Sequence, residues 1–144
     1  MDWKKASIAA CAYAAISQIV YFFGATFDMG YYTDPANAQI WSKVMMPDAG
    51  PPPMEFYLLS LMLGFATGLL YALAFTFVHR SIKAKNALET GLRFGLFIFA
   101  MVSVTGFVSM SLLLAIPAGL QFSWLVQGLV TSLASGLVYA KVMG

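Results

Sequence analysis

The apolar segments of this sequence contain few side chains that could do chemistry. Serine and threonine supply most of their polar groups, and each can return its hydroxyl hydrogen bond to the backbone of its own helix. Gln18 and Gln127 differ, because an amide surrounded by lipid needs a hydrogen-bond partner. The two glutamines therefore either bond neighbouring helices or line a cavity that holds a substrate.

Two tyrosines could belong to the same cavity as the glutamines. Tyr71 and Tyr139 occupy matching positions in two similar segments, toward the same end of the apolar runs that contain them. Tyrosine is enriched at the membrane–water interface, so one interpretation is that both rings are interfacial anchors. The alternative is that their hydroxyl groups complete a cavity with Gln18 and Gln127.

Residue types that many membrane enzymes and carriers require are missing from the apolar runs. No Asp, Glu, Lys or Arg lies inside one, whereas a proton-coupled antiporter generally needs a carboxylate there. His79 is the only histidine and Cys11 the only cysteine, which excludes a two-histidine haem site or a CxxC site within one chain. The sequence has no HExxH motif and no glycine-rich phosphate loop. We expect no enzymatic activity, no cofactor, no metal site and no nucleic-acid partner.

The elements that position these side chains are apolar runs of membrane-spanning length. The chain has 144 residues, of which 60% are hydrophobic and 10% charged, whereas a soluble domain has roughly 25% charged residues. Uncharged runs cover residues 6–27, 56–78, 94–116 and 122–140, and each can cross a hydrocarbon core of about 30 Å as a helix. The sequence predicts an all-α integral membrane protein. It forms one domain over residues 1–144, a bundle of four transmembrane helices.

The basic residues predict the orientation of these helices. Only Lys43 lies between the first and second runs. The other seven of the eight basic residues fall on the opposite side in a four-span arrangement: Lys4, Lys5, Arg80, Lys83, Lys85, Arg93 and Lys141. Because basic residues are concentrated on the cytoplasmic side, we expect a multi-pass protein of the cytoplasmic (inner) membrane with both termini in the cytoplasm.

Two segments of the apolar runs resemble each other. The stretches GFATGLLYA (64–72) and SLASGLVYA (132–140) share five of nine residues, which indicates two helical hairpins in parallel repeat. Small residues recur at every fourth position in both runs and form smooth stripes that permit close helix contact in lipid. The stripes consist of Ser60, Gly64, Gly68 and Ala72 in the second run and Gly128, Ser132, Gly136 and Ala140 in the fourth.

The connections between the runs contain two further signals. In the first outer loop, 28–55, a short amphipathic helix is predicted over about 35–46, with Ile40, Trp41, Val44 and Met45 facing the membrane surface. This segment either covers the end of the bundle or acts as a lid or docking surface. In the inner connection, the run Asn86–Glu89 is typical of a capping box, so a helix should start near Ala87.

Two classes of function are compatible with these features. The first is a non-enzymatic membrane component: an accessory subunit, assembly factor or scaffold that packs in the lipid against a partner membrane protein or further copies of itself. The absence of charge inside the apolar runs favours it. The alternative is a small transporter or binding protein for an apolar or neutral molecule, acting as an oligomer, with Gln18, Gln127, Tyr71 and Tyr139 at its site.

Overall fold

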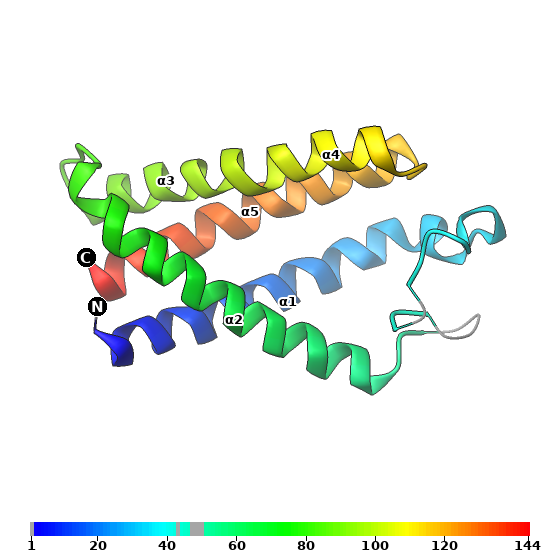
Figure 1. Cartoon of the computed structure of the whole chain (residues 1–144), viewed down its shortest axis with the longest axis horizontal. Helices are drawn as coiled ribbons and strands as arrows, with labels where there is room; N and C mark the ends of the chain where they lie inside the picture. Colours follow the sequence, from blue (N-terminus) through cyan, green and yellow to red (C-terminus); the bar gives the residue numbers. More distant parts are fainter. Residues whose placement is uncertain (1, 43, 47–50) are drawn as a thin grey trace.

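The computed structural model of the chain describes residues 2–42, 44–46 and 51–144. The regular elements of this part are all helices, and it contains no strand. Figure 1 shows long helices that run back and forth along one axis. In chain order the elements are α1 (Trp3–Thr33), η1 (Pro35–Asn37), α2 (Met54–Val78), η2 (His79–Ser81), α3 (Ala87–Ile98), η3 (Phe99–Val104), α4 (Thr105–Leu113) and α5 (Ala118–Met143).

Four helices are long and apolar enough to cross a membrane, as expected of a multi-pass membrane protein: Trp3–Thr33, Met54–Ser81, Ala87–Leu113 and Ala118–Met143. The third consists of α3, η3 and α4, which continue one another. Both chain termini lie at one end of the molecule with the connection between α2 and α3 (Figure 1). We call this the terminal end and the opposite one the loop end.

Helix α1 is longer than the apolar run that predicted it. It begins at Trp3 because Asp2 caps it, its carboxylate accepting bonds from the backbone N–H groups of Lys4 at 3.0 Å and Lys5 at 3.3 Å. At the other end it continues to Thr33, six residues beyond the predicted boundary at Phe27. The apolar run ends before the first charged residue, Asp28, but Asp28 lies within α1 and is buried.

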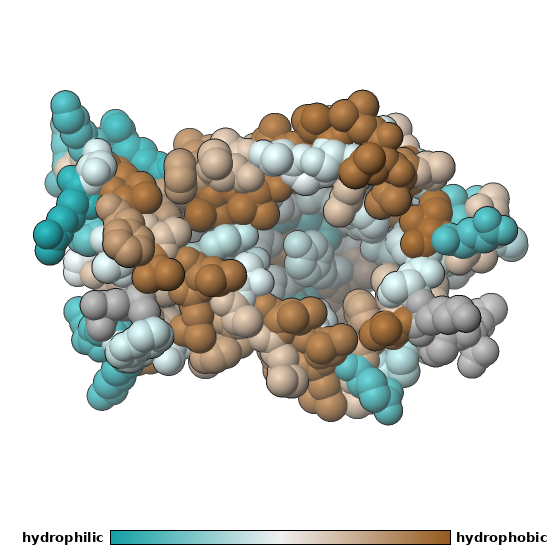
Figure 2. All heavy atoms as spheres, in the orientation of Figure 1, coloured by the Kyte–Doolittle hydropathy of each residue, from teal (hydrophilic) through white to brown (hydrophobic). Residues whose placement is uncertain are grey.

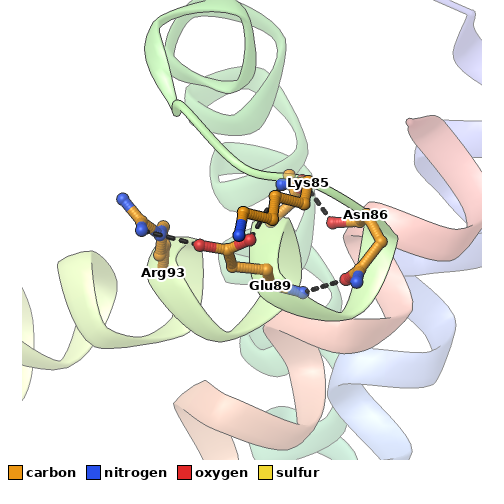
Figure 3. A network of polar contacts seen from close by, with 5 residues as sticks. Lys85, Asn86, Glu89 and Arg93 are labelled. Atoms are coloured by element: carbon orange, nitrogen blue, oxygen red, sulfur yellow. Dashed lines mark hydrogen bonds and ion pairs between the residues drawn. The ribbon is translucent and has the colours of Figure 1, made fainter.

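The predicted start of the third membrane helix is confirmed. Asn86 caps α3, and its side-chain oxygen accepts a bond from the backbone N–H of Glu89 at 2.9 Å. The carboxylate of Glu89 accepts from the backbone N–H of Lys85 at 2.8 Å and pairs with Arg93 at 2.6 Å (Figure 3). Glu89 thus reaches the residue before the cap. The bond from Asn86 satisfies one of the N–H groups that a helix start leaves without partners.

The helices pack in the order α2, α1, α5, α3, so that α1 and α5 are the inner helices and α2 and α3 the outer ones. The segment of α2 from Met54 to Leu63 has no buried residue, and neither has η3 or α4. Near the loop end, therefore, the two outer helices stand apart. Figure 2 shows a hollow in the middle of this face, with apolar side chains along both rims and less apolar ones between them.

The core lies toward the terminal end. Phe75 of α2, Phe94 of α3 and Tyr139 of α5 are each 1% exposed and pack ring against ring. The centroid of the Phe75 ring is 5.0 Å from that of Phe94, and the Phe94 and Tyr139 centroids are 5.8 Å apart. The His79 ring stacks on Phe75 at 5.2 Å, and its Nδ1 donates to backbone carbonyls of α2. This contact accounts for the single histidine as a helix-end packing residue.

The amphipathic helix predicted over 35–46 is not found among the described residues. The helical part is the single turn η1, after which residues 38–42 and 44–46 form turns and irregular backbone; Lys43 and residues 47–50 lie outside the described part. Trp41 supplies the physical reason. Its ring packs on Tyr32 of α1 at 4.8 Å and on Trp124 of α5 at 6.3 Å, so it holds the loop against the helices. Ile40 and Met45 are half-buried and Val44 is exposed, so they form no common helical face.

Candidate functional site: a buried carboxylate between two hairpins

Within the first hairpin, α1 and α2, the helices approach closely at small residues. A Cβ atom on Gly68 would stand 2.7 Å from the Cα of Ala10, well inside the roughly 3.5–4.0 Å at which carbon atoms pack. One turn away, a Cβ on Gly64 would lie 3.5 Å from Ala14. Ala72 of the same predicted stripe is fully buried in the core. The stripe on α2 therefore faces α1, where alanines leave room for it.

The second hairpin, formed by α3, η3, α4 and α5, is packed more closely still. A Cβ atom on Gly136 of α5 would overlap the backbone of Gly91 and Gly95 in α3. Conversely, a Cβ on Gly95 would stand 2.6 Å from the carbonyl oxygen of Ser132. Near the other end of the stripe, Gly128 lies against the hydroxyl of Ser103 in η3. The stripe on α5 thus faces its own hairpin partner, as the stripe on α2 does.

Where α1 meets α5, between the hairpins, the contact is polar and centres on Asp28. This carboxylate is 3% exposed, and Gln127, which faces it, is 8% exposed. The oxygen Oδ2 of Asp28 accepts bonds from the hydroxyl of Ser123 at 2.9 Å and from the amide of Gln127 at 3.0 Å. The same amide nitrogen lies 3.0 Å from the Ser123 hydroxyl, which closes the triangle. The three side chains form a compact polar cluster between α1 and α5.

Local sequence on both helices brings the cluster together. Gly24 precedes Asp28 by one helical turn on α1, and Ser123 precedes Gln127 by one turn on α5, so each pair shares a helix face. A side chain on Gly24 would overlap the amide group of Gln127. The glycine is therefore the position that lets the glutamine lie flat against α1 and reach the carboxylate.

Aromatic side chains adjoin the cluster on the side of the loop end. Tyr32 follows Asp28 by one turn of α1, and its hydroxyl accepts a bond from the indole N–H of Trp124 at 3.2 Å. Trp41 of the first loop packs on both rings. Loop, α1 and α5 together thus form an aromatic group of Tyr32, Trp41 and Trp124 next to the carboxylate.

Further along α5, two buried hydroxyl groups have no hydrogen-bond partner among the described residues. Thr131 and Ser135 follow Gln127 along α5 at intervals of one helical turn and are 4% and 2% exposed. Neither side-chain oxygen has a hydrogen-bond partner within the described part of the chain. Buried hydroxyls normally find one, so these two require an explanation.

The four side chains predicted as a possible cavity do not form one site, although Tyr71 packs against the core cluster that contains Tyr139. Gln18 donates to the hydroxyl of Ser60 at 2.7 Å, which links α1 to α2. Tyr139 donates to the backbone carbonyl of Gly68 at 2.7 Å, and Tyr71 packs edge-on against Tyr13 at 5.1 Å. Only Gln127 contributes to the cluster around Asp28. Each of the others has its own structural partner.

Sequence analysis missed Asp28, which it assigned to the first outer loop. Asp28 lies just outside the predicted run 6–27, but α1 continues past it and buries its carboxylate. One signal could have found it, because residues 28–33 contain no Gly-Pro or Asn-Gly break that would stop a helix. Nothing in the sequence indicates that its partners lie 95 and 99 residues away.

Comparison of the chain with protein-family models, with curated proteins and with solved structures finds no match. The fold is all-helical, with four helices long and apolar enough to span a membrane, which fits a multi-pass membrane protein.

Proposed function

We propose that the protein is a non-enzymatic component of the cytoplasmic membrane that acts by packing against other membrane helices, as an accessory subunit, assembly factor or scaffold. In this proposal both termini are cytoplasmic. Seven of the eight basic residues belong to segments next to the terminal end, and basic residues mark the cytoplasmic side. Membrane lipids cover the remaining apolar surface.

The observation that carries the proposal is the separation of the two outer helices. Near the loop end α2 and α4 have no buried residue, and a hollow lies between them (Figure 2). The Gln18–Ser60 pair is only partly buried, about half-way along α1. In lipid such a polar pair is best covered by another helix, since hydrocarbon offers no hydrogen bonds. A partner helix or a second copy of this chain would fill the hollow.

The small-residue stripes serve the interior in this proposal. They hold each hairpin together, and the apolar faces that remain are available for partners. Both hairpins use a stripe on their second helix against small residues of their first, which supports the hypothesis of a duplicated hairpin.

Photo-crosslinking in the native membrane tests the proposal. A photoreactive residue is introduced at Met62 of α2 or Val108 of α4, both on the outer helices, and the control position is Phe23 on the inner helix α1. All three side chains are exposed. We expect one defined protein adduct from the first two positions and none from Phe23. Lipid adducts alone at all three positions would reject the proposal.

A second candidate has a specific observation in its favour. The polar cluster of Asp28, Ser123 and Gln127 lies between the hairpins, where a small carrier or binding protein would hold a neutral molecule. Native mass spectrometry of the gently purified protein separates the two candidates. A stoichiometric protein companion supports the first, and a homo-oligomer that retains a reproducible small molecule supports the second.

A further inference from the structure

We propose that a small cavity at the terminal end binds the headgroup of a zwitterionic phospholipid, one that carries a phosphate and a primary ammonium group. The cavity has a volume of about 130 Å³ and lies where the start of α1, the end of α2 and the end of α5 meet. Its lining residues are Asp2, Lys5, Phe75, Thr76, His79 and Met143. The site depends on the membrane assignment and on neither function proposed above, so its failure and theirs are separate results.

Two opposite charges line this cavity without pairing with each other. Asp2 and Lys5 are both exposed, and over residues 2–42, 44–46 and 51–144 the one ion pair is that of Glu89 with Arg93. The Asp2 carboxylate caps α1 through Oδ1, which accepts both cap bonds, so Oδ2 is available. A cavity lined by one carboxylate and one ammonium group is complementary to a ligand that carries the same two kinds of charge.

His79 adds a hydrogen-bond acceptor to the lining. Its Nδ1 lies 3.0 Å from the carbonyl oxygen of Phe75 and 3.1 Å from that of Thr76, and since carbonyl oxygens only accept, Nδ1 carries a proton. The other nitrogen of the neutral ring, Nε2, is therefore an acceptor. A primary ammonium group has three N–H donors and can bond both this nitrogen and the Asp2 carboxylate, whereas a quaternary ammonium group has none.

The phosphate of the ligand would bind Lys5. A lysine side chain is a common partner of phosphate groups, and further basic residues of the terminal end are exposed: Lys4, Arg80 and Lys141. Hydrophilic side chains gather at this end of the molecule (Figure 2). The positive potential of such an end attracts phosphate groups at a membrane surface.

The size and position of the cavity favour a lipid headgroup over a whole soluble ligand. Pockets for drug-sized ligands measure roughly 300–1,000 Å³, so a cavity of about 130 Å³ holds only a small polar group. Phe75 and Met143 supply apolar parts of the lining. The helices that meet here are long and apolar enough to span a membrane. A headgroup in the cavity would leave its acyl chains in the lipid beside these helices.

Native mass spectrometry of the full chain, stripped of lipid in detergent, measures the affinity for each added lipid. Three lipids with identical acyl chains are compared: phosphatidylethanolamine, phosphatidylcholine with its quaternary ammonium, and phosphatidylglycerol, which has no ammonium. We expect phosphatidylethanolamine to bind roughly threefold or more tightly than the other two, since only it offers ammonium donors. Free phosphoethanolamine at the same concentration should not displace it. Displacement would overturn the assignment to a lipid.

Variants decide whether the preference belongs to this cavity. Lys5→Gln and Asp2→Asn should each abolish it, and Asp2→Asn retains the helix cap because an asparagine oxygen accepts the same bonds. The matched control is Lys4→Gln, since Lys4 is an exposed neighbour that does not line the cavity. Both lining positions are exposed, and an unchanged melting temperature checks that each variant folds. Equal binding of the three lipids to the parent protein overturns the proposal, as does a preference that survives Lys5→Gln or Asp2→Asn.

Discussion

The interfaces within the hairpins and the interface between them are built from different residues. Inside each hairpin, glycine or alanine on one helix touches backbone on the other, as Gly68 does at Ala10 and Gly136 at Gly91. Between the hairpins, α1 and α5 meet at the carboxylate of Asp28, the amide of Gln127 and the hydroxyl of Ser123. Close van der Waals contact is the main attraction available to helices in lipid, so the small residues should contribute most within each hairpin. Between the hairpins, the polar cluster lies toward the loop end, whereas Phe75, Phe94 and Tyr139 pack together toward the terminal end.

The largest effect is expected where the tight contacts are broken. Gly136→Leu and Gly68→Leu each place a side chain into the backbone of a neighbouring helix. Each should lower the free energy of unfolding by about 3 kcal/mol or more, as overpacking does. Thermal melting of the detergent-solubilised protein measures it. The matched control is Gly106→Leu, because a Cβ on Gly106 meets nothing within 4 Å. Equal melting temperatures for all three variants would mean that the stripes do not hold the hairpins.

A smaller effect is expected in the polar interface. Gln127→Met removes one of the two donors to the buried carboxylate, and hydrogen bonds to charged groups contribute about 1.5–3 kcal/mol. The loss should largely disappear in the double variant Asp28→Leu, Gln127→Met, where no buried charge remains. Chemical unfolding of the four members of this double-mutant cycle gives the coupling. Additive losses would contradict a direct interaction.

The hydroxyl of Tyr139 in α5 links the second hairpin to α2 of the first. Tyr139→Phe keeps the ring in the core and removes the hydroxyl that donates to the carbonyl of Gly68. The expected loss is about 1 kcal/mol. Tyr57→Phe, at an exposed position of α2, serves as the comparison and should melt like the parent protein.

The smallest effect concerns the partly buried pair in the first hairpin. Gln18→Leu removes its bond to Ser60 and should cost about 0.6 kcal/mol, the average for such bonds between membrane helices. Ser60→Ala should cost the same, and the double variant no more than either. A loss above about 2 kcal/mol would place this pair among the main contacts of the hairpin.

Structural features that depend on residues close together in the sequence could be predicted. The four long apolar helices follow from uncharged runs, and the start of α3 follows from Asn86 and Glu89, three residues apart. The amphipathic pattern in the first loop does not give a helix among the described residues, and Trp41 packs on Tyr32 and Trp124 instead. Local periodicity carries no information about such a tertiary partner.

The site was missed for the same reason. A charged residue normally ends an apolar run, so Asp28 was assigned to the loop. Its burial depends on Ser123 and Gln127, which the fold brings from the far end of the sequence, and on Gly24, whose missing side chain admits the amide. Gln127 was recognised as a polar group that needs a partner, but no pattern in the sequence identifies that partner.

Disulfide trapping tests the placement of Asp28 most directly. In a Cys11→Ser background, the pair Asp28→Cys and Ser123→Cys is introduced and the protein is oxidised in its native membrane. These side chains are in hydrogen-bond contact, so we expect an intramolecular disulfide, detected by mass after proteolysis. Phe27→Cys with Ser123→Cys is the control and should remain reduced, because Phe27 is 86% exposed. Free thiols in the first pair, or equal trapping in both, would show that Asp28 is not buried against α5.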